Sequence, residues 1–286
     1  MRVASTFNDA GIRGKCVGKL LEVKNLQTEF ATSAGVVKAV DNVTYSVDEG
    51  ETVAIVGESG SGKSVGALSI LQLIPDPPGK IIGGEILFEG HDLLKLSQEE
   101  VRQIRGRKIS MVFQEPMTAL DPVYTIGDQI AETVKRHKGC SPADGLARAL
   151  ELLELVKVPS ASRRLKAYPH ELSGGLRQRA MIAMALSCRP KLLLADEPTT
   201  ALDATVQVQV LILLRRLQQE MGMGVIFVTH DLGVAAEVAD RVAVMYAGRI
   251  VETGTVKDVL GNPQHPYTQG MLNSTVHGNM RGQDIE

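Results

Sequence analysis

The chain has few cysteines and no long apolar runs. Its three cysteines, at positions 16, 140 and 188, match neither a zinc site nor a disulfide framework. So sparse and odd a set is typical of a reducing compartment. No run of 18 or more apolar residues occurs, so the sequence predicts no membrane-spanning helix. The first residues also lack the apolar stretch of a secretory signal.

There is no excess of positive charge either. The formal net charge is −2, which argues against a nucleic-acid partner. The densest basic cluster is Arg102, Arg105, Arg107 and Lys108, and we interpret it as a solvated face. With 286 residues, 44% hydrophobic and 22% charged, the chain is an ordinary folded protein of one domain or two lobes.

One eight-residue stretch predicts phosphate binding. It matches the pattern G-x-x-x-x-G-K-[ST] over Gly57, Glu58, Ser59, Gly60, Ser61, Gly62, Lys63 and Ser64. An apolar run, 52–56, precedes it and a helical pattern, 65–73, follows. Glycines let successive N–H groups point at phosphate oxygens, Lys63 would reach the β- and γ-phosphates, and Ser64 would bind Mg²⁺. The alternative is a glycine-rich turn before a helix.

A second motif places carboxylates at a strand tip. The apolar run 192–195 ends at Asp196, and Glu197 follows at once. The carboxyl end of a strand is where an α/β sheet places its ligand groups. We expect Asp196 to help hold Mg²⁺ and Glu197 to act as general base on the attacking water. The alternative is a strand followed by an acid that caps a turn.

A third motif predicts a further anion site. Ser173 is a suitable helix N-cap, and Gly174 and Gly175 open a helix that we expect to reach Leu186. A helix N-terminus binds anions, and a second phosphate site in one chain suggests a second molecule. The alternative is an ordinary helix cap after a turn.

Residues 172–179, Leu-Ser-Gly-Gly-Leu-Arg-Gln-Arg, resemble the signature motif of ABC-type ATPases. The resemblance implies an α/β fold: a P-loop NTPase core with an antiparallel β subdomain and a helical subdomain. It also implies a head-to-tail dimer that sandwiches two ATP molecules, with Ser173, Gly174 and Gly175 capping the γ-phosphate bound to the partner chain. The cofactors it implies are ATP and Mg²⁺.

Other residues fall where the same resemblance places functional groups. Gln114 resembles the Q-loop glutamine, which contacts Mg²⁺ and water, and His230 resembles the switch histidine that touches the γ-phosphate. Asp203, in Ala201-Leu202-Asp203, resembles the D-loop aspartate at the dimer seam. Phe30 resembles the aromatic residue that stacks on adenine, although a lone Phe at a strand end is equally at home in a core.

Two segments sharpen the resemblance. Residues 114–122 and the tail 262–268, Asn-Pro-Gln-His-Pro-Tyr-Thr, are similar to ATPases of bacterial oligopeptide, dipeptide and nickel importers. This implies a subunit that hydrolyses ATP to energise peptide import, bound at the cytoplasmic face of the bacterial inner membrane. Its partners would be a second ATPase subunit, identical or paralogous, two permease subunits and, indirectly, an extracytoplasmic solute-binding protein. The alternatives are import of nickel, glutathione or another small solute, a non-transport ABC ATPase, or a regulatory nucleotide-binding module.

The chain divides into three parts. We expect a disordered extension over 1–18, an ATP-binding domain over 19–260 with a helical subdomain at about 115–188, and an irregular tail over 261–286. In the second predicted helix of the helical subdomain we expect Leu146, Leu150, Leu153 and Val156 to share one apolar face. The predicted strands are 20–23, 45–47, 83–90, 109–113, 191–195, 225–229, 241–246 and 249–252, and the predicted helices are 126–137, 142–156 and 204–221.

Overall fold

The computed structural model describes residues 19–200 and 202–280. The predicted extension 1–18, Ala201 and the end of the tail lie outside the described residues.

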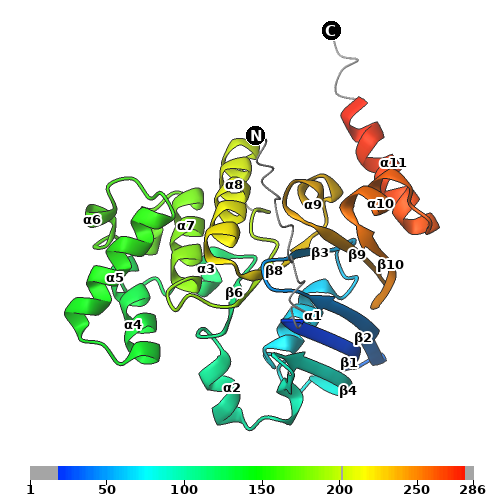
Figure 1. Cartoon of the computed structure of the whole chain (residues 1–286), viewed down its shortest axis with the longest axis horizontal. Helices are drawn as coiled ribbons and strands as arrows, with labels where there is room; N and C mark the ends of the chain where they lie inside the picture. The colour runs from blue at the N-terminus through cyan, green and yellow to red at the C-terminus, as the bar shows by residue number, and fades with distance from the viewer. Residues whose placement is uncertain (1–18, 201, 281–286) are drawn as a thin grey trace, which may run out of the picture.

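Two sheets and a helical arm make up the fold (Figure 1). The strands are β1 (Leu21–Thr32), β2 (Gly35–Val47), β3 (Thr52–Val56), β4 (Gly79–Phe88), β5 (His91–Asp92), β6 (Ile109–Val112), β7 (Leu192–Asp196), β8 (Gly224–Thr229), β9 (Arg241–Tyr246) and β10 (Arg249–Thr255). The helices are α1 (Lys63–Ile70), α2 (Gln98–Ile104), α3 (Pro116–Ala119), α4 (Ile126–Lys138), α5 (Pro142–Leu155), α6 (Ala161–Arg164), α7 (Gly174–Ala185), α8 (Ala204–Met221), α9 (Leu232–Val238), α10 (Val256–Gly261) and α11 (Pro266–Met280).

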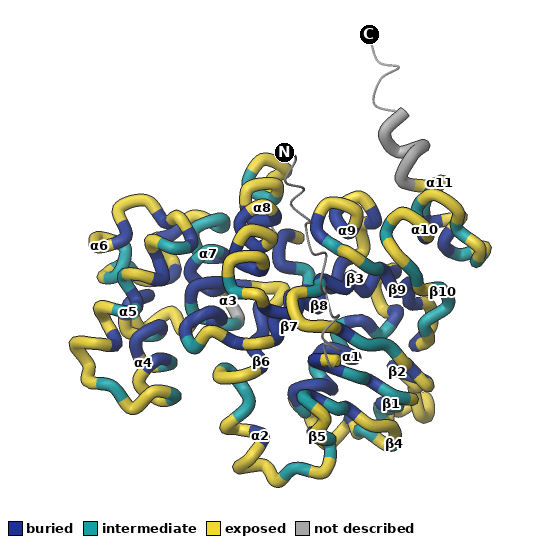
Figure 2. Tube along the Cα trace, in the orientation of Figure 1, coloured by how far each residue is buried: buried dark blue, intermediate teal, exposed yellow. Residues whose placement is uncertain are grey.

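The central sheet brings the loops that carry the predicted site residues together at the carboxyl ends of its parallel strands. Its order is β10-β9-β3-β8-β7-β6, and all of these strands except β10 run parallel to their neighbours. Strands β3, β7 and β8 are buried along their whole length, as the uninterrupted apolar runs predict for a parallel sheet covered on both faces. Figure 2 shows this burial at the centre of the molecule. Because the strands are parallel, the loops after β3, β7 and β8 meet at the same edge.

The antiparallel sheet has longer strands than the sequence predicts. β1 and β2 form a hairpin that continues to the pair Thr32 and Gly35, well beyond the expected strands 20–23 and 45–47. The outer half of β2 is exposed, including Val36 and Val37, so no buried alternation marks it in the sequence. The part of the hairpin that packs on the core reaches Leu26 and Val40, so it too extends beyond the predicted strands.

The helical arm consists of α3 to α7 and shares an apolar core with the central sheet. The predicted apolar face of α5 is confirmed at Leu153 and Val156, which are buried, and at Leu150, which packs on the core, but it is wrong at Leu146, which is 41% exposed. The buried residues of α5 are Gly145, Ala149, Leu152 and Leu153, so the buried face is centred one side of the predicted one. Gly145 explains the phase: a Cβ there would lie 3.2 Å from the Ala131 carbonyl oxygen, so α4 approaches α5 along the glycine side.

The predicted irregular tail is wrong over residues 266–280, which form α11. Pro263 and Pro266 favour an irregular tail in the sequence. Pro266, however, occupies the first position of α11, where its fixed φ and missing N–H are compatible with a helix. Helix α11 lies beside α9 and α10, against the outer part of the central sheet (Figure 1).

Candidate functional site

The predicted phosphate loop connects β3 to α1, which begins at Lys63 rather than at the expected residue 65. The first turn of α1 therefore belongs to the loop. The Lys63 ammonium is buried and donates hydrogen bonds to the carbonyl oxygens of Gly57, at 2.8 Å, and Glu58, at 2.7 Å. Burial lowers the pKa of Lys63, and the charges of nearby carboxylates act against that shift. The lysine is thus held over the loop by the loop's own backbone.

Three glycines let the loop fold tightly against its neighbours. Gly60 and Gly62 have φ angles of 81° and 103°, which favour glycine. A Cβ on Gly62 would lie 2.1 Å from the Ala39 carbonyl oxygen, and one on Gly57 would lie 2.2 Å from that of Met245. Side chains are excluded at both places, so the backbone can form the concave cradle that phosphate binding requires.

Two oxygen donors lie side by side at the start of α1 and the end of β7. The Ser64 hydroxyl donates a 2.9 Å hydrogen bond to Oδ1 of Asp196, which is 6% exposed. Burial raises the pKa of Asp196, and the Ser64 hydrogen bond acts against that rise. Hydroxyl and carboxylate oxygens beside a phosphate cradle fit Mg²⁺, which takes few protein ligands and keeps water and phosphate oxygens. Within 19–200 and 202–280, no group of three or more His, Cys, Asp or Glu residues offers a rival metal site.

Glu197 is the centre of a second cluster. Its φ is 43°, an unfavourable conformation for a side-chain-bearing residue, and its N–H donates to the Val228 carbonyl oxygen at 3.0 Å. Its Oε2 accepts from Gln114 Nε2 at 3.1 Å and lies 3.3 Å from His230 Nδ1. Gln114 and His230, predicted from two separate motifs, thus converge on one oxygen of Glu197, which comes from a third.

Thr200 completes this cluster and was missed by the sequence analysis. Its hydroxyl donates to the same Glu197 Oε2 at 2.9 Å. The signal was present, because a hydroxyl three residues after an acid in a turn is well placed to bond it. The prediction for this motif rested on the carboxylates of Asp196 and Glu197 alone.

The signature residues lie elsewhere on the surface. Ser173 is exposed at the N-cap of α7, but its side chain makes no capping hydrogen bond, contrary to the ideal cap that the sequence suggests. Among the described residues, no hydrogen bond connects Ser173, Gly174 or Gly175 with the phosphate loop. Asp203 caps α8, with Oδ1 accepting from the Val206 N–H at 3.0 Å. Within one chain these residues do not complete the phosphate site.

Phe30 belongs to β1 and faces Gly79 across the strand pair. A Cβ on Gly79 would lie 2.6 Å from the Phe30 ring and 2.6 Å from the Ile74 side chain, so the half-buried ring packs closely on that backbone. Its stacking on adenine stays a prediction.

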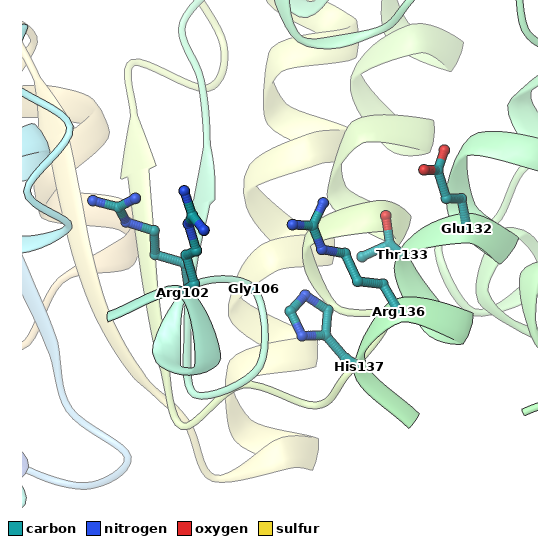
Figure 3. A pocket seen from close by; sticks show the side chains of 7 residues that line it. Arg102, Gly106, Glu132, Thr133, Arg136 and His137 are labelled. Atoms are coloured by element: carbon teal, nitrogen blue, oxygen red, sulfur yellow. The ribbon is translucent and has the colours of Figure 1, made fainter. Parts of the chain in front are cut away.

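A basic pocket lies away from the phosphate loop, between α2 and α4 (Figure 3). Its volume is about 420 Å³, and its wall includes the basic residues Arg102, Arg136 and His137 together with the acid Glu132. Arg105, also in its wall, donates to the carbonyl oxygens of Leu71 at 2.7 Å and Gln72 at 2.8 Å. Part of the basic cluster that was predicted to be a plain solvated face therefore lines a concave site.

The glycine cradle follows the buried strand β3, and Asp196 stands at the end of β7, which only β8 separates from β3. With the helical arm, this arrangement defines a P-loop nucleotide-binding protein. Two family models match this chain: ABC transporter over residues 40–200, and Oligopeptide/dipeptide transporter, C-terminal region, over 251–284. The chain belongs to the ABC transporter family.

Relatives agree with that assignment. The oligopeptide transport ATP-binding protein OppD of Bacillus subtilis (strain 168) is 56% identical, with 90% of this chain and 72% of that protein covered. The dipeptide transport ATP-binding protein DppD of the same organism is 52% identical, with 93% and 80% covered. The dimeric ABC transporter cassette MJ0796 superposes with a TM-score of 0.74 and 32% identity, covering 82% of this chain and 98% of that one. A second MJ0796 structure is described as a post-hydrolysis dimer bound to ADP and Pi.

Proposed function

We propose that this chain is the ATP-hydrolysing subunit that energises a membrane importer of di- and oligopeptides. The observation that carries the proposal is the convergence of the phosphate cradle, the Ser64–Asp196 pair and the Glu197 cluster on one edge of the central sheet. The names of the relatives support the choice of peptides, as does the match of the C-terminal region.

Different residues of one chain have different roles in ATP hydrolysis. Lys63 and the N–H groups of the loop bind the β- and γ-phosphates, and Phe30 stacks on adenine. Glu197 takes the proton of the attacking water. Gln114 and His230 share the Glu197 oxygen and so link the position of this base to the γ-phosphate. Ser64, Asp196 and Gln114 would hold Mg²⁺, which neutralises charge on the phosphates.

Two chains are needed for a complete site. Ser173 is exposed and its side chain makes no capping hydrogen bond, and Gly174 and Gly175 open a helix N-terminus beside it. We propose that these groups bind the γ-phosphate on the partner's loop, with Asp203 at the seam. ATP then binds the closed dimer more tightly than the open one and so favours closure, and hydrolysis removes the link. The likeness to a dimeric cassette supports this arrangement.

The partners on the membrane side are two permease subunits. No helix in the described part of the chain is long and apolar enough to span a bilayer. The basic pocket between α2 and α4 bridges the core and the helical arm, and Phe113 and Met117 are exposed along the segment that joins these two parts. We propose that short helices of the permease contact this region at the cytoplasmic face of the membrane. Movement of the arm is thereby transmitted to them.

Reconstitution tests the proposal. The purified chain should hydrolyse ATP with Mg²⁺, and Lys63→Ala should lose nucleotide affinity; normal ATP affinity in that variant would contradict the role of the loop. Co-purification with two hydrophobic subunits separates a transporter from a non-transport ABC ATPase. Uptake assays with peptide, nickel and glutathione in vesicles then identify the cargo. Uptake of nickel or glutathione without uptake of peptide would contradict peptide as the transported substrate.

A further inference from the structure

The C-terminal segment reaches the phosphate loop through one hydroxyl group. The backbone N–H of Glu58 donates a 2.9 Å hydrogen bond to the hydroxyl oxygen of Tyr267, which is 209 residues away in the sequence. The carbonyl oxygen of Glu58 accepts from the Lys63 ammonium at 2.7 Å and from the Ser61 N–H at 3.2 Å. Both polar groups of the Glu58 backbone are therefore fixed, one by the tail and one by the lysine that would bind phosphate.

The tyrosine itself is firmly placed. The Glu252 carboxylate, on β10, accepts from the N–H groups of Gln264 at 2.8 Å and His265 at 3.0 Å. His265 Nδ1 in turn accepts from the Tyr267 N–H at 3.1 Å. The Tyr267 ring packs on that of Tyr246, with 4.5 Å between the ring centroids. Glu252 thus anchors the start of α11 to the central sheet, and α11 presents the hydroxyl to the loop.

We propose that Tyr267 is a positioning residue for the phosphate loop, so that nucleotide affinity depends on how α11 is attached. The inference rests on the proposed function, because it presumes that the loop binds ATP. A loop that is already ordered loses less conformational freedom when a phosphate binds, and this raises affinity. Burial raises the pKa of Tyr267, so the hydroxyl remains an uncharged group beside a phosphate site.

The test removes one oxygen atom from the full-length chain. Binding of a non-hydrolysable ATP analogue with Mg²⁺ is measured by calorimetry, and hydrolysis gives kcat and KM. Tyr267→Phe should raise Kd and KM about three- to tenfold, the range expected for one neutral hydrogen bond, while kcat and the melting temperature stay unchanged. The matched control is Tyr246→Phe, since no hydrogen bond of the Tyr246 hydroxyl is found within the described residues; it should bind as the wild type does.

A second variant tests the attachment of α11. Glu252→Gln should also raise Kd, and in the Tyr267→Phe background it should add little, because it acts through the same hydroxyl. Unchanged Kd in Tyr267→Phe, or the same loss in Tyr246→Phe, would overturn the inference while the ATPase assignment stands. Fully additive effects of the two substitutions would overturn the coupling through α11. A wild-type chain that binds no ATP would overturn the proposed function, and this inference with it.

Discussion

The Thr200 hydroxyl donates a 2.9 Å hydrogen bond to Oε2 of Glu197. Gln114 Nε2 donates to the same oxygen, and His230 Nδ1 lies close to it. None of these three groups uses Oε1. All three therefore hold the carboxylate through one oxygen, and in the proposed mechanism the other oxygen accepts the proton of the attacking water.

Substitution of Thr200 tests this relationship. Thr200→Val keeps the shape of the side chain but removes the donor, so we expect kcat to fall about tenfold with little change in KM, as for the loss of a hydrogen bond to a charged group. Thr200→Ser retains a hydroxyl and should retain most of the activity. Steady-state ATPase assays measure both. A valine variant as fast as the wild type would show that Gln114 and His230 suffice.

The proposed role of Glu197 as general base predicts a trapped dimer. Glu197→Gln should bind ATP, hydrolyse it only slowly and accumulate as a dimer, because the γ-phosphate that joins the two chains is no longer removed. Light scattering on a sizing column with ATP and Mg²⁺ measures the mass. The control is the double variant with Lys63→Ala, which should remain monomeric. A monomer of Glu197→Gln under saturating ATP and Mg²⁺ would count strongly against the head-to-tail arrangement.

The success of sequence-based prediction differs between parts of the molecule. Helix α8 has its predicted bounds, and β9 and β10 form the predicted hairpin, because local patterns and turn residues determine them. The sequence does not predict the hydrogen bond between Tyr267 and Glu58. That contact joins residues 209 apart, and no local periodicity encodes it. The same holds for Ser64 and Asp196, whose nearness was inferred from motif chemistry alone.

Asp196 should cost the folded chain stability at neutral pH. Burial raises its pKa, so the folded state binds a proton more tightly than the unfolded state does. The contribution of Asp196 to the free energy of unfolding therefore rises as the pH falls through the folded-state pKa towards the unfolded-state pKa. The same contribution is lost as the pH rises through the folded-state pKa. Asp196→Asn removes the buried charge and should raise the melting temperature at pH 7, while Mg²⁺-dependent hydrolysis is lost. Thermal unfolding from pH 4 to pH 8 measures the difference, and a variant less stable than the wild type at pH 7 contradicts the argument.

Alanine substitutions at Gly174 and Gly175 separate the packing of a single chain from contact between two chains. A Cβ there would lie 3.6 Å from the nearest atom, on Leu202, so one chain by itself accommodates alanine. At Gly175 a Cβ would lie 2.5 Å from Cγ1 of Val206, so alanine must disturb the packing of α7 on α8. Gly175→Ala should therefore lower the melting temperature, whereas Gly174→Ala should leave it unchanged or raise it slightly, since alanine favours helix.

In the Glu197→Gln background, Gly174→Ala should nevertheless abolish the ATP-dependent dimer. The added methyl group would stand at the helix N-terminus that is proposed to approach the partner's γ-phosphate. Sizing-column mass and melting temperature, measured on the same samples, separate the two effects. If Gly174→Ala still dimerises at the same ATP concentration, this glycine does not lie at the seam. The N-terminus of α7 would then not contact the γ-phosphate on the partner's loop through Gly174.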